Sequence, residues 1–153
     1  MLTLTPTHWF SWNFRVTAGG EDIAVIGRHW FRERAAFSVG GTSFAVRKTT
    51  AFRSNFVLER NGWVVAEARK PSAFRRRFEL TIGGKQLVLR SASPFRREFR
   101  LFDGAREVGR IRPLSFLGRT ATAELPETMP MEIQLFVIFL VLMLWKREAD
   151  AGA

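Results

Sequence analysis

The sequence contains no cysteine and no tyrosine, and only two histidines occur among its 153 residues. Without cysteine, the chain can form no disulfide, no thiolate zinc site and no cysteine nucleophile, and it suits a reducing compartment. Acidic residues are scarce as well, with 14 Asp and Glu against 24 Lys and Arg, which gives a net charge of +10. The amino terminus lacks the basic and apolar segments of a secretory signal. We therefore expect a cytoplasmic protein.

Candidate catalytic and metal-binding residues are equally few. His8 and His29 each stand beside a tryptophan, and two histidines without a third ligand make a weak case for zinc. The sequence shows no Ser-His-acid arrangement, no close acid pair in an apolar context, and no glycine-rich loop followed by Lys-Ser or Lys-Thr. It therefore predicts no enzyme, no metal site and no cofactor.

Long apolar runs are missing too, with one exception near the carboxyl end. From Leu135 to Trp145 every side chain is apolar, so a helix here has no polar face. Such a helix must be enclosed by lipid or by its own protein. A run of this length rises about 16 Å at ~1.5 Å per residue, against ~30 Å for the hydrocarbon core of a bilayer. The length favours a helix buried in protein, and a membrane tail anchor over residues 131–145 is the alternative.

Turn-forming dipeptides recur every 20 to 22 residues along the rest of the chain. They are Gly19-Gly20, Gly40-Gly41, Asn61-Gly62, Gly83-Gly84 and Asp103-Gly104. Each accepts the positive φ angles of a two-residue hairpin loop, and alternating apolar residues beside the turns are the signal of strands. Five hairpins give ten strands, and Arg119 to Leu125 is expected to add another.

The strands predict a mainly β fold, a closed antiparallel barrel of about twelve strands. A barrel of this size is too wide for its own wall to fill, so we expect the apolar helix inside it. Its packing side chains are Leu135, Phe136, Phe139, Leu140, Leu142, Met143 and Trp145. Residues 1–153 then form one domain, with strands over about 10–125, the helix over about 131–146 and a flexible tail at 147–153.

The ends of the helix are predicted from flanking residues. Pro126 and Pro130 end the preceding strand and set the helix start near Met131. Lys146 and Arg147 are expected to face the carbonyl end of the helix, where positive charge is favourable.

A motif with Phe, Phe and Leu at spacing 0, 4 and 6 occurs at residues 52–58, 74–80 and 95–101. On a regular strand these three side chains face one way, which we assign to the barrel interior. By the same alternation Arg76 and Arg97 would point inward, which is costly for a charge. A β-bulge that shifts the register is the favoured explanation, and a position at the barrel rim is the alternative.

These features resemble the tubby C-terminal-like superfamily. The resemblance covers about Phe10 to Arg147 and is carried by the block from Leu125-Pro126-Glu127 to Lys146-Arg147, with the repeated Phe-Arg strands in support. In size the chain is most similar to the LURP-one-related and phospholipid-scramblase-like branch, in its small bacterial form. The resemblance implies a twelve-stranded barrel around a buried helix, and contact of basic side chains with anionic lipid headgroups. The acid-rich calcium segment and cysteine-rich acylation segment of scramblases are absent, so lipid scrambling is not implied.

Positive charge is concentrated in the middle of the chain, with 21 Lys and Arg against 7 Asp and Glu between Arg28 and Arg119. We predict an anionic-lipid-binding surface on the outer wall, where Arg53, Arg75 and Arg96 would form a row. Its residues are Arg47, Lys48, Arg53, Lys70, Arg75, Arg77, Arg96 and Arg100. A cytoplasmic membrane leaflet attracts such clusters by about 1 kcal/mol per cation. The simpler interpretation is a solvated exterior in which Glu59, Glu79 and Glu98 form cross-strand pairs.

The expected function is a non-enzymatic module that binds anionic phospholipid at the inner face of the membrane. Nucleic-acid binding would use the same charge, but single-strand binding needs exposed aromatic platforms, and the phenylalanine rows are assigned to the core. A scaffold that recognises only a protein partner is a further alternative.

Overall fold

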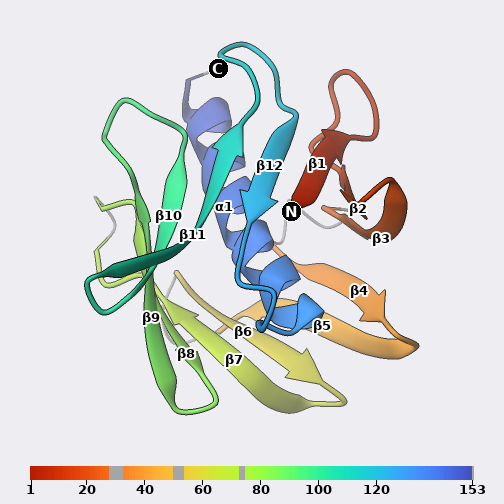
Figure 1. Ribbon diagram of the computed structural model, residues 1–153, viewed down its shortest axis with the longest axis vertical. Coiled ribbons are helices and arrows are strands. Elements are labelled where there is room, and N and C mark those ends of the chain that lie inside the picture. Colours follow the sequence, from red (N-terminus) through yellow and green to blue (C-terminus); the bar gives the residue numbers. More distant parts are fainter. Residues whose placement is uncertain (28–32, 50–53, 73–74, 153) are drawn as a thin grey trace.

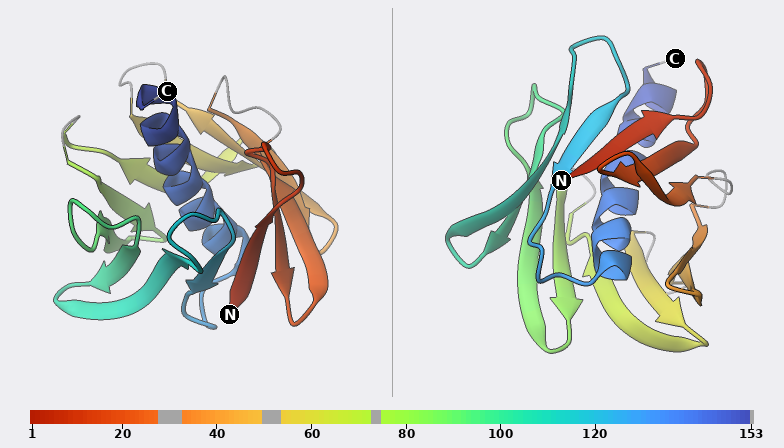
Figure 2. Two further views of the ribbon diagram at one scale, coloured as in Figure 1. Left: turned by 90° about the horizontal axis from the view of Figure 1, so that it is seen from above. Right: turned by 45° about the vertical axis from the view of Figure 1, so that its right-hand side comes forward.

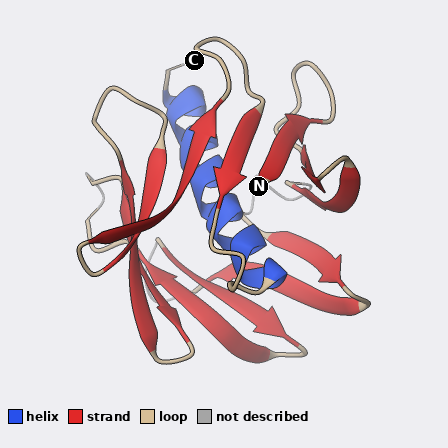
Figure 3. Ribbon diagram, in the orientation of Figure 1, coloured by secondary structure: helices blue, strands red, loops and turns tan. Residues whose placement is uncertain are grey.

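The computed structural model describes residues 1–27, 33–49, 54–72 and 75–152, and these contain twelve strands and one helix (Figure 3). The elements are β1 (Leu2–Pro6), β2 (Phe14–Ala18), β3 (Glu21–Ile26), β4 (Ala35–Val39), β5 (Thr42–Lys48), β6 (Asn55–Arg60), β7 (Trp63–Arg69), β8 (Arg77–Ile82), β9 (Lys85–Ser91), β10 (Phe99–Asp103), β11 (Arg106–Pro113), β12 (Ala121–Glu124) and α1 (Met131–Ala151).

The strands form one antiparallel sheet that curls into a nearly closed barrel. Its order is β3-β2-β1-β12-β11-β10-β9-β8-β7-β6-β5-β4, so every neighbour is also a neighbour in sequence except β1 and β12. That pair joins the two ends of the chain's strand region, with Leu2 opposite Ala123 and Leu4 opposite Ala121. The outermost strands, β3 and β4, share no ladder in the described part of the chain. The predicted barrel of about twelve strands is therefore confirmed.

Short and long connections alternate along the meander, so the barrel has two different ends. Two-residue turns join each even-numbered strand to the next from β2 to β11, and they occupy one end. Four of them are the predicted dipeptides. The fifth lies one residue later than predicted, at Gly104 and Ala105, because Asp103 still pairs with Arg106 in the ladder. In the β6–β7 turn Asn61 and Gly62 have φ of 51° and 80°, the positive values that such a turn requires.

Helix α1 fills the barrel, as Figures 1 and 2 show. Every side chain from Ile133 to Trp145 is buried, so the enclosure that the apolar run requires is the barrel wall and not lipid. The inward rows of the strands supply the other half of this core. Phe139 of the helix lies edge-on to Phe56 of β6, with ring centroids 5.8 Å apart. Burial of so many large side chains, at about 1.5–3 kcal/mol each, makes this contact the main driving force of the fold.

The predicted secondary structure needs correction near both ends of the chain. The helix begins at Met131 after Pro130, as predicted, but it runs to Ala151, so residues 147–151 are helical and not a flexible tail. Lys146 and Arg147 therefore precede the last turn and bind Asp150 and Glu33 instead of facing the carbonyl end. Strand β1 was missed, because the strand region was placed from about residue 10. Its alternation of buried Leu2 and Leu4 with threonines is a short strand signal.

The repeated Phe-Arg motif is only partly strand. Phe56, Phe78 and Phe99 are fully buried, as predicted, whereas Phe95 is 97% exposed because it precedes β10. Phe52 and Phe74 lie outside the described residues. The predicted bulge at Arg76 and Arg97 is wrong, since the register shifts recorded in the ladders lie at residues 16/17, 58/59 and 101/102. Both arginines lie in connections, which was the alternative.

The helix core provides a test with a matched control. We expect Phe139→Ala to lower the free energy of unfolding by about 3–5 kcal/mol, because it leaves a cavity at the centre of the barrel. Phe95→Ala removes the same atoms from a side chain that is 97% exposed, so it should change stability by less than about 0.5 kcal/mol. Urea unfolding of both variants checks this, and equal losses would contradict the placement of the helix.

Candidate functional site: the long-loop end of the barrel

The end of the barrel opposite the hairpin turns carries most of the positive charge that is not on strands. We call it the long-loop end, and it is formed by the described residues of the connections 7–13, 27–34, 49–54, 70–76, 92–98 and 114–120. Helix α1 also ends here (Figure 1). The cations of the described residues in these connections are Arg34, Lys70, Arg75, Arg76, Arg96, Arg97 and Arg119. Among the same residues the only acids are Glu33 and Glu98.

The hairpin end has the opposite character. Its five two-residue turns carry no charged residue, and the segment 125–130 that leads into the helix contains only Glu127. The end of α1 does not neutralise the long-loop end, because Lys146 and Arg147 balance Glu148 and Asp150. The connections at the two ends of the barrel therefore differ in charge.

Four of the predicted lipid-binding residues lie on strands and form ion pairs with carboxylates: Arg47, Lys48, Arg77 and Arg100. Arg47 Nε lies 2.5 Å from Glu59, and Arg100 contacts both Glu98 and Glu107 at 3.1 and 3.2 Å. Arg77 lies 3.9 Å from Glu79. A hydrogen bond from Arg69, which offsets partial burial, holds the pKa of Glu79 below its usual value. These contacts match the simpler interpretation, in which carboxylates pair with cations on a solvated exterior.

The predicted position of Arg75 and Arg96 on the outer wall is wrong. Arg75 and Arg96 lie on neighbouring connections at the long-loop end, and Arg53 lies outside the described residues. Both are exposed, and neither side chain has an acidic partner in the described part of the chain. Lys70 lies on the same connection as Arg75 and donates a hydrogen bond to Ser72 O at 2.7 Å. Burial lowers the pKa of Lys70, and the nearby charge of Arg147 lowers it further.

Three arginines of this end join neighbouring connections, and we call Arg76, Arg97 and Arg119 the bridging arginines. Arg76 Nη1 donates to Arg96 O at 3.0 Å. Arg97 Nη2 donates to three carbonyl oxygens of the next connection, those of Ser115, Phe116 and Gly118, at 3.0–3.2 Å. Arg119 in turn donates to the carbonyl oxygens of Trp9 and Ser11. The four connections that carry these residues are thereby linked in order around the barrel.

The helix anchors this chain of contacts. Trp145 Nε1 donates to Arg97 O at 2.8 Å, and the guanidinium of Arg97 lies over the indole ring, 5.9 Å from its centroid. Arg76 Nε lies 2.6 Å from Glu148 Oε1, with its N–H turned away from hydrogen-bond geometry. Burial lowers the pKa of Arg97, and the charge of Glu148 partly offsets this. Direct contacts of Trp145 and Glu148 thus connect the helix to the long-loop end.

Carbonyl oxygens satisfy an arginine without neutralising it. Arg97 and Arg119 use their N–H groups on neutral backbone acceptors, so each keeps a full positive charge. Together with Arg75 and Arg96, they leave the long-loop end with uncompensated positive charge at neutral pH.

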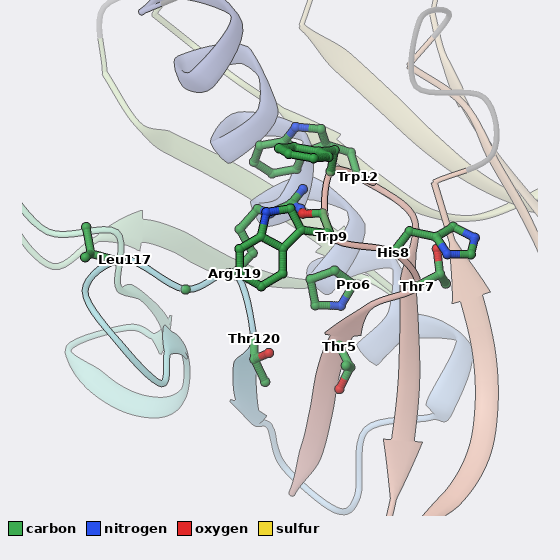
Figure 4. A pocket seen from close by; sticks show the side chains of 11 residues that line it. Thr5, Pro6, Thr7, His8, Trp9, Trp12, Leu117, Arg119 and Thr120 are labelled. Carbon is green, nitrogen blue, oxygen red and sulfur yellow. The ribbon is translucent and has the colours of Figure 1, made fainter.

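A cleft of about 740 Å³ lies between the connections 7–13 and 114–120. Figure 4 shows Trp9, Trp12 and Arg119 gathered in it, with Thr5 and Thr120 at the strand ends below. The guanidinium of Arg119 lies over the Trp12 ring, 5.4 Å from its centroid. His8 lines the same cleft and is exposed, whereas His29 lies outside the described residues.

Large apolar side chains stand exposed at the same end, which sequence reasoning missed. Trp9, Phe10, Phe95, Phe116 and Leu117 expose between 85% and 97% of their surface, and Leu114 exposes 59%. They lie on the connections 7–13, 92–98 and 114–120. The signal that could have found them is turn chemistry, because Ser93-Pro94 and Ser115 to Gly118 break the strand pattern around Phe95 and Phe116. The premise that the phenylalanine rows all belong to the core was therefore wrong for Phe95.

Glu33 ties the helix end to the wall beside the gap between β3 and β4. Its carboxylate accepts from Lys48 Nζ at 2.6 Å and from Arg147 Nε at 2.5 Å. Burial acts to raise the pKa of Glu33, but these two hydrogen bonds and the charges behind them outweigh it, so the pKa is lowered. Lys48, another predicted lipid-binding residue, thus shares the Glu33 carboxylate with Arg147.

No group of three or more potential metal ligands occurs in the described ranges. No helix within those ranges is long and apolar enough to cross a membrane. Comparisons with protein-family models, with curated proteins and with solved structures found no match.

The bridging role of Arg97 predicts that its shape matters more than its charge. Arg97→Lys keeps the cation but cannot reach three carbonyl oxygens, so we expect it to lower the free energy of unfolding by about 1–2 kcal/mol. Arg96→Lys is the control, because the Arg96 side chain is exposed and should tolerate the change. Urea unfolding measures both, and a neutral effect of Arg97→Lys would contradict the bridge.

The Glu33 contact predicts a pH-dependent contribution to stability. Since its folded pKa is lowered from the ordinary 4.5, the ionised carboxylate stabilises the fold above that value and loses this effect as the pH falls through the folded pKa. We expect Glu33→Gln to be less stable than the unmodified chain at about pH 7, with the difference shrinking toward about pH 3. Unfolding midpoints at the two pH values decide, and a constant difference would refute the ionic contact.

Proposed function

We propose that this protein is a non-enzymatic module that binds anionic phospholipid headgroups through the cations of its long-loop end. The observation that carries the proposal is the concentration of cations on the connections of the long-loop end, where Glu33 and Glu98 are the only acids among the described residues. Arg75 and Arg96 are exposed there without an acidic partner among the described residues, beside Arg97 and Arg119, which bind only neutral carbonyl oxygens. Such a cluster attracts the phosphate groups of an anionic membrane surface.

The strand wall supports the proposal by contrast. Arg47, Arg77 and Arg100 have carboxylate partners, so an incoming phosphate would have to displace an existing ion pair. The proposed surface is therefore narrower than the set expected from the sequence, and it retains Arg75, Arg96 and Lys70. The resemblance to tubby-like domains, whose basic side chains contact lipid headgroups, points to the same ligand class.

Nucleic-acid binding is the second candidate, because exposed phenylalanines beside arginines could stack on bases. The exposed aliphatic residues argue for the membrane instead. Leu114 and Leu117 have no flat face for stacking, yet they stand exposed among the same connections. A lipid surface accommodates both kinds of apolar side chain.

A charge reversal with a matched control tests the proposal. We expect Arg75→Glu with Arg96→Glu to weaken binding to phosphatidylglycerol vesicles tenfold or more, since each lost cation contributes about 1 kcal/mol. Arg60→Glu with Arg106→Glu makes the same change in net charge near the hairpin turns, where binding should change little.

Sedimentation with vesicles at moderate salt measures both variants. Equal recovery of the unmodified chain with phosphatidylcholine and with phosphatidylglycerol vesicles would refute the proposal. An equal loss in the two double variants would show that net charge, and not the long-loop end, governs binding.

A further inference from the structure

We infer that the protein docks end-on to an anionic bilayer and inserts the tips of three connections into its interfacial layer. This inference rests on the proposed phospholipid binding and adds an orientation and a second binding force. The three connections are 7–13, 92–98 and 114–120, and we call their exposed apolar residues the apolar tips. The tips are Trp9, Phe10, Phe95, Phe116 and Leu117.

The three connections have the same construction. In each, the first backbone N–H donates to the carbonyl oxygen of the last residue, at 2.8–2.9 Å: Thr7 to Asn13, Ala92 to Glu98, and Leu114 to Thr120. This bond closes the connection at its base and leaves a five-residue tip. The apolar side chains occupy the third or fourth residue of every connection, so they stand at the middle of each tip.

The three tips are neighbours at one end of the barrel. Their connections join β1 to β2, β11 to β12, and β9 to β10, and these six strands are consecutive in the sheet. Figure 1 shows all three beside the carboxyl end of α1, at the top of the barrel, and the turned view in Figure 2 agrees.

The tips are held outward by contacts that do not use their side chains. Arg97 fixes the connection 114–120 through three carbonyl oxygens, and Arg119 fixes the connection 7–13 through two. Ser93 Oγ and Ser115 Oγ accept the N–H groups of Phe95 and Gly118 within the tips. Exposing large apolar side chains on ordered loops forfeits the stabilisation that their burial would give, which is typical of residues that are covered by a partner.

Charge and shape identify that partner as a lipid surface. The five-residue segments that carry the apolar tips contain no acid, and their cations are Arg96, Arg97 and Arg119. Apolar side chains and positive charge therefore lie at the same end of the barrel. Tryptophan and phenylalanine prefer the interfacial layer of a membrane, and basic residues bind the phosphates beside it. Separate protruding tips penetrate a fluid surface, whereas the core of a protein interface is usually a contiguous patch.

Two sets of variants of the full chain test the docking orientation. Phe95→Ala, Phe116→Ala and Leu117→Ala together remove the exposed apolar side chains of two connections, 92–98 and 114–120. Trp63→Ala with Val64→Ala removes exposed apolar side chains at the hairpin end. All these residues are exposed, so unchanged urea unfolding should confirm that both variants fold. We expect the tip variant to bind phosphatidylglycerol–phosphatidylcholine vesicles at least about tenfold more weakly than the unmodified chain. Its remaining binding should depend more steeply on salt concentration, because only the electrostatic part of binding is left. The hairpin-end variant should bind like the unmodified chain.

Tryptophan fluorescence reports the depth of insertion. Vesicles with brominated acyl chains should quench the unmodified chain, and Trp9→Phe should remove most of this quenching while Trp63→Phe does not. If the protein binds anionic vesicles but the tip variant binds equally well and Trp9 is not quenched, end-on docking is overturned while phospholipid binding stands. If the unmodified chain does not bind anionic vesicles at all, both proposals fail. Loss of single-stranded RNA binding in the tip variant, without quenching by vesicles, would make the tips a nucleic-acid surface and overturn the inference.

Discussion

The enclosure of one apolar helix by the inward side chains of twelve strands is the constraint on which the rest of this structure depends. The side chains of a barrel this wide cannot fill its interior, and a helix without a polar face is not stable when exposed to water. The helix therefore fills the barrel, and the barrel buries the helix. The contact of Phe139 with Phe56 is one instance of a core in which every helix position from Ile133 to Trp145 is buried. The axis of the helix then distinguishes the two ends of the barrel.

The long-loop end shows how the same residue type can serve architecture and charge at once. The bridging arginines Arg76, Arg97 and Arg119 lie one or two residues before the even-numbered strands that follow them, and each binds the neighbouring connection. Because most of their partners are carbonyl oxygens, the loops gain order without loss of positive charge. Trp145 links this network to the core, so the surface proposed for lipid is held by the most stable part of the molecule.

The sequence predicted the fold more completely than the site. Turn dipeptides and the terminal apolar run were enough for the barrel and its central helix, because both signals are local and strong. The predicted lipid-binding set misplaced two cations: Arg75 and Arg96 lie on connections and not on the strand wall. Its prediction extended strand alternation back to Phe95 and Arg96, whereas β10 begins at Phe99, and a strand boundary shift of this size moves a side chain from the core to full exposure. The sequence suggested Glu59 and Glu79 as pairing carboxylates, but it did not show which cation each would meet. The structure pairs Arg47 with Glu59 and Arg100 with Glu107 across strands.

By itself the sequence determined the period of the hairpins, the excess of positive charge and the need to bury residues 135–145, because each is a property of residue types and their spacing. Only the tertiary structure decided which cations meet carboxylates and which meet neutral carbonyl oxygens. It also decided that the connections carrying Trp9, Phe95 and Phe116, which are distant in sequence, lie at one end of the barrel. The reason is geometric: alternate connections of an antiparallel meander all return to the same end, so spacing along the chain becomes proximity in space.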